Sequence, residues 1–175
     1  MGSVLRIWHE YREEGRAQPK DAKLPEKQEL ELASEHTDID SIVINKEEST
    51  VYISDPECFL DVGAVAKGYA VEKIAEELES RGISGYVINV GGNVRTIGAR
   101  GDKTPWKVGV EAPEEFEESY LCMTELSGES LVTSGNYQRY YTVDGKKYHH
   151  IINPETLMPS ENYLSVSVIA NDSAL

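Results

Sequence analysis

The sequence is short of cysteine, and it has no long apolar run. Its two cysteines, Cys58 and Cys122, lack the paired spacing of a zinc or redox motif. Both lie in apolar runs typical of strands, so we expect buried free thiols, although the sequence leaves a disulfide between them open. No apolar stretch approaches the roughly 20 residues of a membrane span. No signal peptide or lipidation cysteine stands at the N-terminus.

Basic residues are also scarce. Lys and Arg number 17 against 31 Asp and Glu, which gives a formal net charge of −14. Nucleic-acid binding relies on clustered Lys and Arg that neutralise phosphates, so the composition argues against a nucleic-acid partner. It does not argue against a small anionic ligand, because a local pocket can be positive on an acidic protein.

Several standard enzyme motifs are absent. The chain has no Gly-x-x-x-x-Gly-Lys-Ser/Thr phosphate loop, no dinucleotide fingerprint and no nucleophile elbow. His149 and His150 have no second His or Cys pair at ligand spacing, which argues against a zinc site.

The pattern of apolar residues predicts an α+β fold. With 175 residues, 39% of them apolar, the chain is expected to form one domain over residues 1–175. Two main helices are predicted, over residues 25–36 and after Lys67, whereas residues 1–23 show no clear periodicity. The predicted strands cover residues 41–45, 50–54, 86–90, 94–99, 106–110, 120–126, 130–133, 140–143, 146–151 and 163–170. Repeated hairpins among these strands indicate largely antiparallel sheets.

The helix after Lys67 has the clearest pattern. Three glutamates, Glu72, Glu76 and Glu79, are predicted to lie away from its apolar face, which consists of Ala70, Val71, Ile74, Ala75 and Leu78. The segment that leads into it, residues 61–70, reads Asp-Val-Gly-Ala-Val-Ala-Lys-Gly-Tyr-Ala. Small residues and a lysine at a helix start suit a phosphate, because the first helical N–H groups lack intrahelical partners. A tight turn explains the segment equally well.

Three further segments have compositions that suit a ligand. They are Gly91-Gly92-Asn93 after a buried strand, Thr133-Ser134 at a strand end, and His149-His150. Each also has an ordinary structural explanation, as a turn, a capped loop or a hydrogen-bonded core histidine. Adjacent residues of a strand point to opposite faces, so at most one of the two histidines faces a given pocket.

Taken in order, these segments resemble the ApbE family of FAD:protein FMN transferases. The matching segments are residues 61–70, 86–94 (YVINVGGNV), 105–113 (PWKVGVEAP), 132–137 (VTSGNY) and 149–156 (HHIINPET), with Pro159. The resemblance covers about residues 41–175. Several long segments in the same order make it specific, whereas each segment alone is weak.

The resemblance implies Mg²⁺-dependent transfer of FMN from FAD to a threonine or serine hydroxyl of an acceptor flavoprotein, with release of AMP. The acceptor would be a subunit of a membrane redox complex. By the same resemblance His150 helps to activate the acceptor hydroxyl, Lys67 contacts FAD, and the Ala64 carbonyl is a metal ligand. The other residues implied to bind FAD are Gly68, Gly91, Gly92, Asn93, Thr133 and Ser134.

The chain departs from the family pattern at several points. Asn153 stands where the family usually has Asp, and Leu157 where it often has Gly. The family's main metal segment follows the residues that match 172–175, so the remaining ligands are expected beyond Leu175, with Asp172 open as a substitute. The family's N-terminal third has no counterpart before Met1. We therefore expect a central portion of a longer transferase, and the resemblance implies a location in the extracytoplasmic cell envelope.

Other functions stay open on the sequence alone. Water in place of the acceptor would make the protein a Mg²⁺-dependent FAD pyrophosphatase that yields FMN and AMP. Without the metal segment, the chain would be a non-catalytic FAD-binding module. A structural domain in which the loops are only turns is the third alternative.

Overall fold

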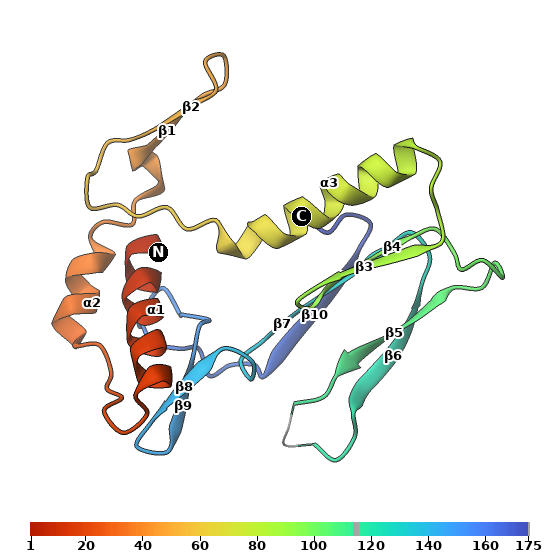
Figure 1. Cartoon of the computed structure of the whole chain (residues 1–175). Coiled ribbons are helices and arrows are strands. Elements are labelled where there is room, and N and C mark those ends of the chain that lie inside the picture. The colour runs from red at the N-terminus through yellow and green to blue at the C-terminus, as the bar shows by residue number, and fades with distance from the viewer. Residues whose placement is uncertain (114–115, 175) are drawn as a thin grey trace. The chain divides into compact units, whose positions relative to one another are not determined.

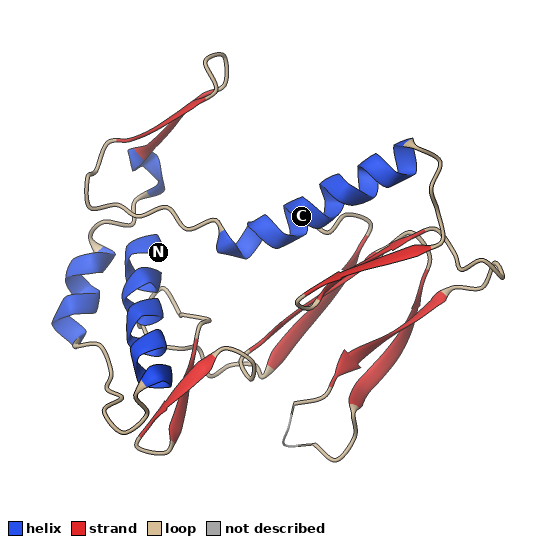
Figure 2. Ribbon diagram, viewed as in Figure 1, coloured by secondary structure: helices blue, strands red, loops and turns tan. Residues whose placement is uncertain are grey.

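The structure, a computed structural model, describes residues 1–113 and 116–174; the metal ligands expected beyond Leu175 lie outside these residues (Figure 1). Helices combine with antiparallel sheets (Figure 2), which confirms the predicted α+β class. The chain forms two compact units. Unit 1 comprises residues 1–61 and 138–162, and unit 2 comprises residues 62–137 and 163–175. The single domain over residues 1–175 stays a prediction.

Unit 1 packs two helices against a hairpin. Its elements are α1 (Gly2–Ala17), α2 (Lys27–Ser34), the 3-10 turn η1 (Ile39–Ser41), β1 (Ile42–Asn45), β2 (Thr50–Ile53), β8 (Tyr140–Val143) and β9 (Lys146–His149). The core is formed by Val4, Trp8, Leu30 and Tyr141. Trp8 lies edge-on to Tyr141, with ring centroids 6.5 Å apart, and its indole N–H donates to the Leu157 carbonyl at 2.8 Å. Burial of these aromatic side chains is what joins α1 to β8 and β9.

Helix α1 corrects the prediction for residues 1–23, where no helix was expected. Val4, Ile7, Trp8 and Tyr11 all contribute to the unit 1 core. Their spacing of three, four and seven residues is that of one helix face. The signal was therefore present, but the charged residues between these positions obscure it.

Unit 2 is built around a four-stranded sheet. Its elements are α3 (Gly63–Ser80), β3 (Tyr86–Val90), β4 (Asn93–Ile97), β5 (Trp106–Glu111), β6 (Tyr120–Leu126), β7 (Ser130–Gly135) and β10 (Ser165–Ala170). The strand order is β10-β7-β4-β3, with each neighbouring pair antiparallel. Helix α3 contacts β4 and β3, while the β5-β6 hairpin packs its Val110 and Leu126 against Leu131 of β7. The sheet thus has α3 on one face and the hairpin on the other.

Most predicted strands are confirmed to within a few residues, including the β8-β9 hairpin. Its turn residues Asp144 and Gly145 have φ of 49° and 80°, the left-handed conformation that a two-residue hairpin turn requires. The predicted burial of both thiols is wrong: Cys122 is exposed on β6, Cys58 is half-buried, and both are free. Strand β6 buries only part of its length, so an apolar run there does not imply burial at each position. Among the described residues, no helix has the length and apolar character to cross a membrane.

Candidate functional site

The predicted site begins at the N-terminal turn of α3. The helix starts at Gly63, four residues earlier than predicted; its N-cap residue, Val62, makes no side-chain capping bond, and its first turn has no acidic residue. Val65 and Ala66 already donate their N–H groups to the Val62 carbonyl. What favours an anion here is therefore chiefly the positive end of the helix dipole. Lys67, half-buried, makes no salt bridge with any residue in 1–113 or 116–174.

Ala64 offers one oxygen for a metal ion. In an α-helix the carbonyl of residue 64 faces the N–H of residue 68, and its second lone pair stays available. Within residues 1–113 and 116–174, no three His, Cys, Asp or Glu side chains gather as a metal site would need. The described residues therefore do not make a complete Mg²⁺ site by themselves.

Gly68 is buried against the segment that follows β10. A Cβ atom on Gly68 would collide with the carbonyl oxygen of Ser173. The Ser173 hydroxyl donates to the Gly68 carbonyl at 3.2 Å. The structure thus gives this predicted FAD-binding residue a packing function, because only glycine admits so close an approach.

Gly91 and Gly92 form the two-residue turn between β3 and β4. Their φ angles are 53° and 89°, so both positions favour glycine. The Gly92 carbonyl accepts from the Thr133 N–H at 2.8 Å, which ties the turn to β7. Asn93, which follows, is buried: its Nδ2 donates to the Ser173 carbonyl at 3.4 Å, and its Oδ1 has no partner among the described residues.

Thr133 and Ser134 do not share a face of the sheet. Ser134 lies on the same face of β7 as Ser130. Ser130 pairs with Arg95, whose side chain points to the face covered by α3. Thr133 lies on the same face as Leu131, which packs against the β5-β6 hairpin. The Thr133 hydroxyl forms a hydrogen bond with the Ser167 hydroxyl on β10 at 2.8 Å. Their side chains therefore cannot line one wall of a pocket together. Among the predicted residues, Gly68 and Asn93 meet at Ser173, and Gly92 meets Thr133.

The two histidines differ in their surroundings, and both belong to unit 1. The His149 Nε2–H donates to the Ser160 carbonyl at 2.9 Å, and its Nδ1 accepts from the Ile151 N–H at 3.2 Å. Both ring nitrogens are thus used, which makes His149 a structural residue. Burial lowers its pKa.

His150 has a nitrogen to spare. Its Nδ1 is buried and has no partner among the described residues. Burial lowers the pKa of His150, and the positive charge of Arg139 lowers it further. The imidazole is therefore neutral at neutral pH, in the state that can accept a proton.

Glu72 and Arg95 are functional-site neighbours that the sequence analysis missed. Glu72 was predicted to lie away from the apolar face of α3, but it is only 7% exposed. Its carboxylate accepts from Arg95 Nε at 3.1 Å and from the Ser173 N–H at 2.9 Å. Burial alone would raise the pKa of Glu72, but the Ser173 and Arg95 hydrogen bonds outweigh it and lower the pKa. Glu72 lies four residues from Gly68 and three from Ala75, which are both buried, so helical spacing places it on the buried face of α3, and the pair with Arg95 compensates its charge. Ala70 and Ile74, predicted on the apolar face, are instead exposed.

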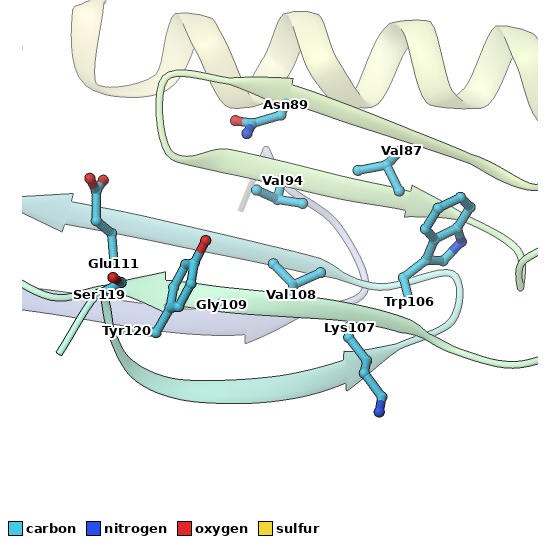
Figure 3. Close-up of a pocket in the computed structure, with 10 residues that line it drawn as sticks. All are labelled: Val87, Asn89, Val94, Trp106, Lys107, Val108, Gly109, Glu111, Ser119 and Tyr120. Atoms are coloured by element: carbon cyan, nitrogen blue, oxygen red, sulfur yellow. The ribbon is translucent and has the colours of Figure 1, made fainter.

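A cavity of about 550 Å³ lies in unit 2 between the β3-β4 and β5-β6 hairpins (Figure 3). It is lined by Val87, Asn89, Val94, Trp106, Lys107, Val108, Gly109, Glu111, Ser119 and Tyr120. None of the site residues predicted from the resemblance lines it. It lies on the sheet face opposite α3, whereas the α3 N-terminus and Ser134 lie on the other face.

Fold and site together define an α+β protein in which Gly68 of α3 lies against Asn93, the residue that follows a glycine turn. The sequence profile described as the ApbE family matches residues 1–175. The chain belongs to the ApbE family.

Individual proteins agree with this assignment. The FAD:protein FMN transferase of Escherichia coli K12 is 30% identical over 173 residues, which are 97% of this chain and 48% of that protein. The Rhodobacter capsulatus protein of the same name is 41% identical over 128 residues, 73% of this chain and 24% of that protein. The crystal structure of the ApbE protein from Thermotoga maritima superposes with a TM-score of 0.83 at 30% identity, covering 99% of this chain and 55% of that one. The chain thus spans about half the length of the relatives that it matches, or less.

Proposed function

We propose that this chain provides the core of an enzyme that transfers FMN from FAD to a threonine or serine hydroxyl of an acceptor flavoprotein. The observation that carries the proposal is the match of the ApbE family over residues 1–175. The relatives of E. coli and R. capsulatus are named FAD:protein FMN transferase, which supports the transfer of FMN from FAD to a protein. The positive end of the α3 dipole supports it, because FAD presents a pyrophosphate.

The reaction needs a base and a means of neutralising phosphate charge. The hydroxyl oxygen of the acceptor attacks the phosphorus of the FMN moiety, the pyrophosphate P–O bond to the AMP moiety breaks, and AMP leaves. We assign the hydroxyl proton to the free nitrogen of His150, since its lowered pKa keeps the imidazole neutral at neutral pH. Lys67 and the start of α3 supply positive charge for the pyrophosphate.

Mg²⁺ dependence is part of the proposal. Ala64 supplies one carbonyl oxygen, a ligand type that suits Mg²⁺. The family resemblance implies that the remaining ligands belong to a segment beyond Leu175. The membrane redox complex as the source of the acceptor, and the cell envelope as the location, are likewise proposals from the family resemblance.

Intact mass measurement tests the transfer directly. The chain is incubated with FAD, Mg²⁺ and an acceptor domain that carries the threonine motif, and the product is an acceptor heavier by one FMN. A matched reaction uses the protein extended at both ends. We expect activity in the extended protein, and loss of it on Lys67→Ala or His150→Ala. Unchanged transfer in both variants would contradict the assigned roles.

A non-catalytic FAD-binding module is the second candidate, favoured by the absence of a metal cluster among the described residues. It predicts that the extended protein binds FAD and forms no product. Analysis for free FMN and AMP without acceptor separates a third outcome, FAD pyrophosphatase activity, from both.

A further inference from the structure

A buried ion pair joins α3 to the central sheet. Glu72 and Arg95 have side chains 9% and 6% exposed. The guanidinium also donates to the carbonyls of Thr96 at 2.6 Å and Gly128 at 2.7 Å. Arg95 thereby connects the helix, strand β4 and the turn before β7, and its position is fixed from three sides.

The pair also anchors the segment after β10. Glu72 Oε2 accepts from the Ser173 N–H at 2.9 Å and from the Ser173 hydroxyl at 3.2 Å. On its other side, Ser173 is bound by Gly68 and Asn93, as described above. Every polar atom of Ser173 is thus engaged by residues that belong to, or adjoin, the predicted FAD-binding set.

We propose that Glu72, fixed by Arg95, is a positioning residue for FAD binding: it holds Ser173 in place between Gly68 and Asn93, two residues of the predicted FAD-binding set. The inference rests on the proposed function. A displacement of Ser173 would release both Gly68 and Asn93 from their present contacts. Arg95, which also pairs with Glu79 at 3.4 Å, offsets part of the charge of Glu72, which would otherwise repel a pyrophosphate.

Positioning and simple electrostatics predict opposite changes in the Kd for FAD when Glu72 is replaced by glutamine. Glu72→Gln removes a negative charge near the proposed phosphate site, and electrostatics alone predicts that FAD binds more tightly. Positioning predicts the opposite, because glutamine cannot pair with Arg95 and accept both bonds from Ser173. We expect the Kd for FAD to rise about tenfold, the effect of losing one well-placed interaction. Binding is followed by flavin fluorescence in the full chain.

Hydrogen exchange provides a readout independent of FAD. We expect the amides of Ser173 and Ala174 to exchange faster in Glu72→Gln, while those of β4 stay protected. Glu76→Gln is the matched control: it removes the same charge from the same helix, where the side chain is exposed and pairs with Lys73 at 2.6 Å. It should leave exchange and FAD affinity unchanged.

Ser173→Ala covers the case in which Glu72→Gln does not fold. It deletes the hydroxyl bonds to Glu72 and Gly68 and keeps the ion pair, so a rise of about threefold in Kd is expected. Unchanged or tighter FAD binding in these variants, with wild-type binding intact, would overturn the positioning role alone. Retained Ser173 protection in Glu72→Gln would overturn it as well. A wild-type chain that binds no FAD, even when extended, would instead refute the proposed function together with this inference.

Discussion

The two units of this protein are stabilised in different ways. Unit 1 joins its two chain segments through an aromatic core, in which Trp8 of α1 meets Tyr141 of β8. Unit 2 joins its segments through a buried ion pair, with Glu72 of α3 bound to Arg95 and to Ser173. Apolar contacts tolerate small shifts, whereas hydrogen bonds of a buried charge fix direction. The unit that carries Lys67 and the glycine turn is the one that uses directional bonds.

Trp8→Ala should have the largest effect and should act on unit 1. Truncation leaves a cavity and an unpaired Leu157 carbonyl, at a cost of about 3 to 5 kcal/mol in the free energy of unfolding. Urea unfolding combined with hydrogen exchange measures the loss for each unit. Trp8→Phe keeps most of the apolar volume and should cost clearly less. Equal losses for the two variants would show that packing is not what holds unit 1.

Arg95→Met tests the corresponding contact in unit 2. It leaves the Glu72 carboxylate buried without its cation, and we expect a loss of about 3 kcal/mol in unfolding free energy. The double variant with Glu72→Met should recover much of this loss, because a paired apolar replacement removes the buried charge. Arg81→Met, which breaks the exposed pair with Glu77, should cost less than about 0.5 kcal/mol. If Arg95→Met alone is as stable as Arg81→Met, the buried ion pair does not stabilise unit 2 and the contrast between the units is wrong.

Gly68→Ala probes the closest contact in unit 2. The added methyl group meets the Ser173 carbonyl, so we expect a loss of about 1 to 3 kcal/mol and faster exchange at Ser173. Gly101→Ala is the control, since an added Cβ there meets nothing within 4 Å. Similar chemical denaturation midpoints for the two variants would argue against tight packing at Gly68.

Acid should affect unit 1 at higher pH than unit 2. Burial lowers the pKa of His149 and His150 below 6.5, so the unfolded chain binds more protons as the pH falls through 6.5. Each histidine then removes at most about 1.4 kcal/mol per pH unit. In unit 2, Glu72 has a lowered pKa. It contributes stability that is fully present above pH 4.5 and is lost only as the pH falls through the pKa of the folded state.

His36 opposes this trend within unit 1. Its hydrogen bond to Asp55 raises its pKa, so it contributes stability below pH 6.5 that disappears as the pH rises. His149→Gln removes the contribution of one buried histidine and leaves His36 unchanged. We therefore expect the variant to lose less unit 1 protection than the wild type between pH 7 and 5. Exchange measured at pH 7, 6 and 5 checks this. Equal acid sensitivity in variant and wild type would assign the effect elsewhere.

The sequence by itself determined the local elements. Amphipathic spacing predicts α3, and the turns at Gly91-Gly92 and Asp144-Gly145 predict two hairpins, because each depends on residues that are neighbours in the chain. The ordered motifs also predicted the ApbE family, which the match over residues 1–175 confirms.

Only the tertiary structure decided which of these residues meet. Glu72 is buried because Arg95 and Ser173, 23 and 101 positions away in sequence, supply its partners. Thr133 and Ser134 point to opposite faces by strand alternation alone, but only the pairing of β7 with β4 decides which of them faces α3. Helical spacing places Glu72 on one face with Gly68 and Ala75, but it does not say which distant groups meet that face, since the free energy of these bonds comes from groups far apart in the chain.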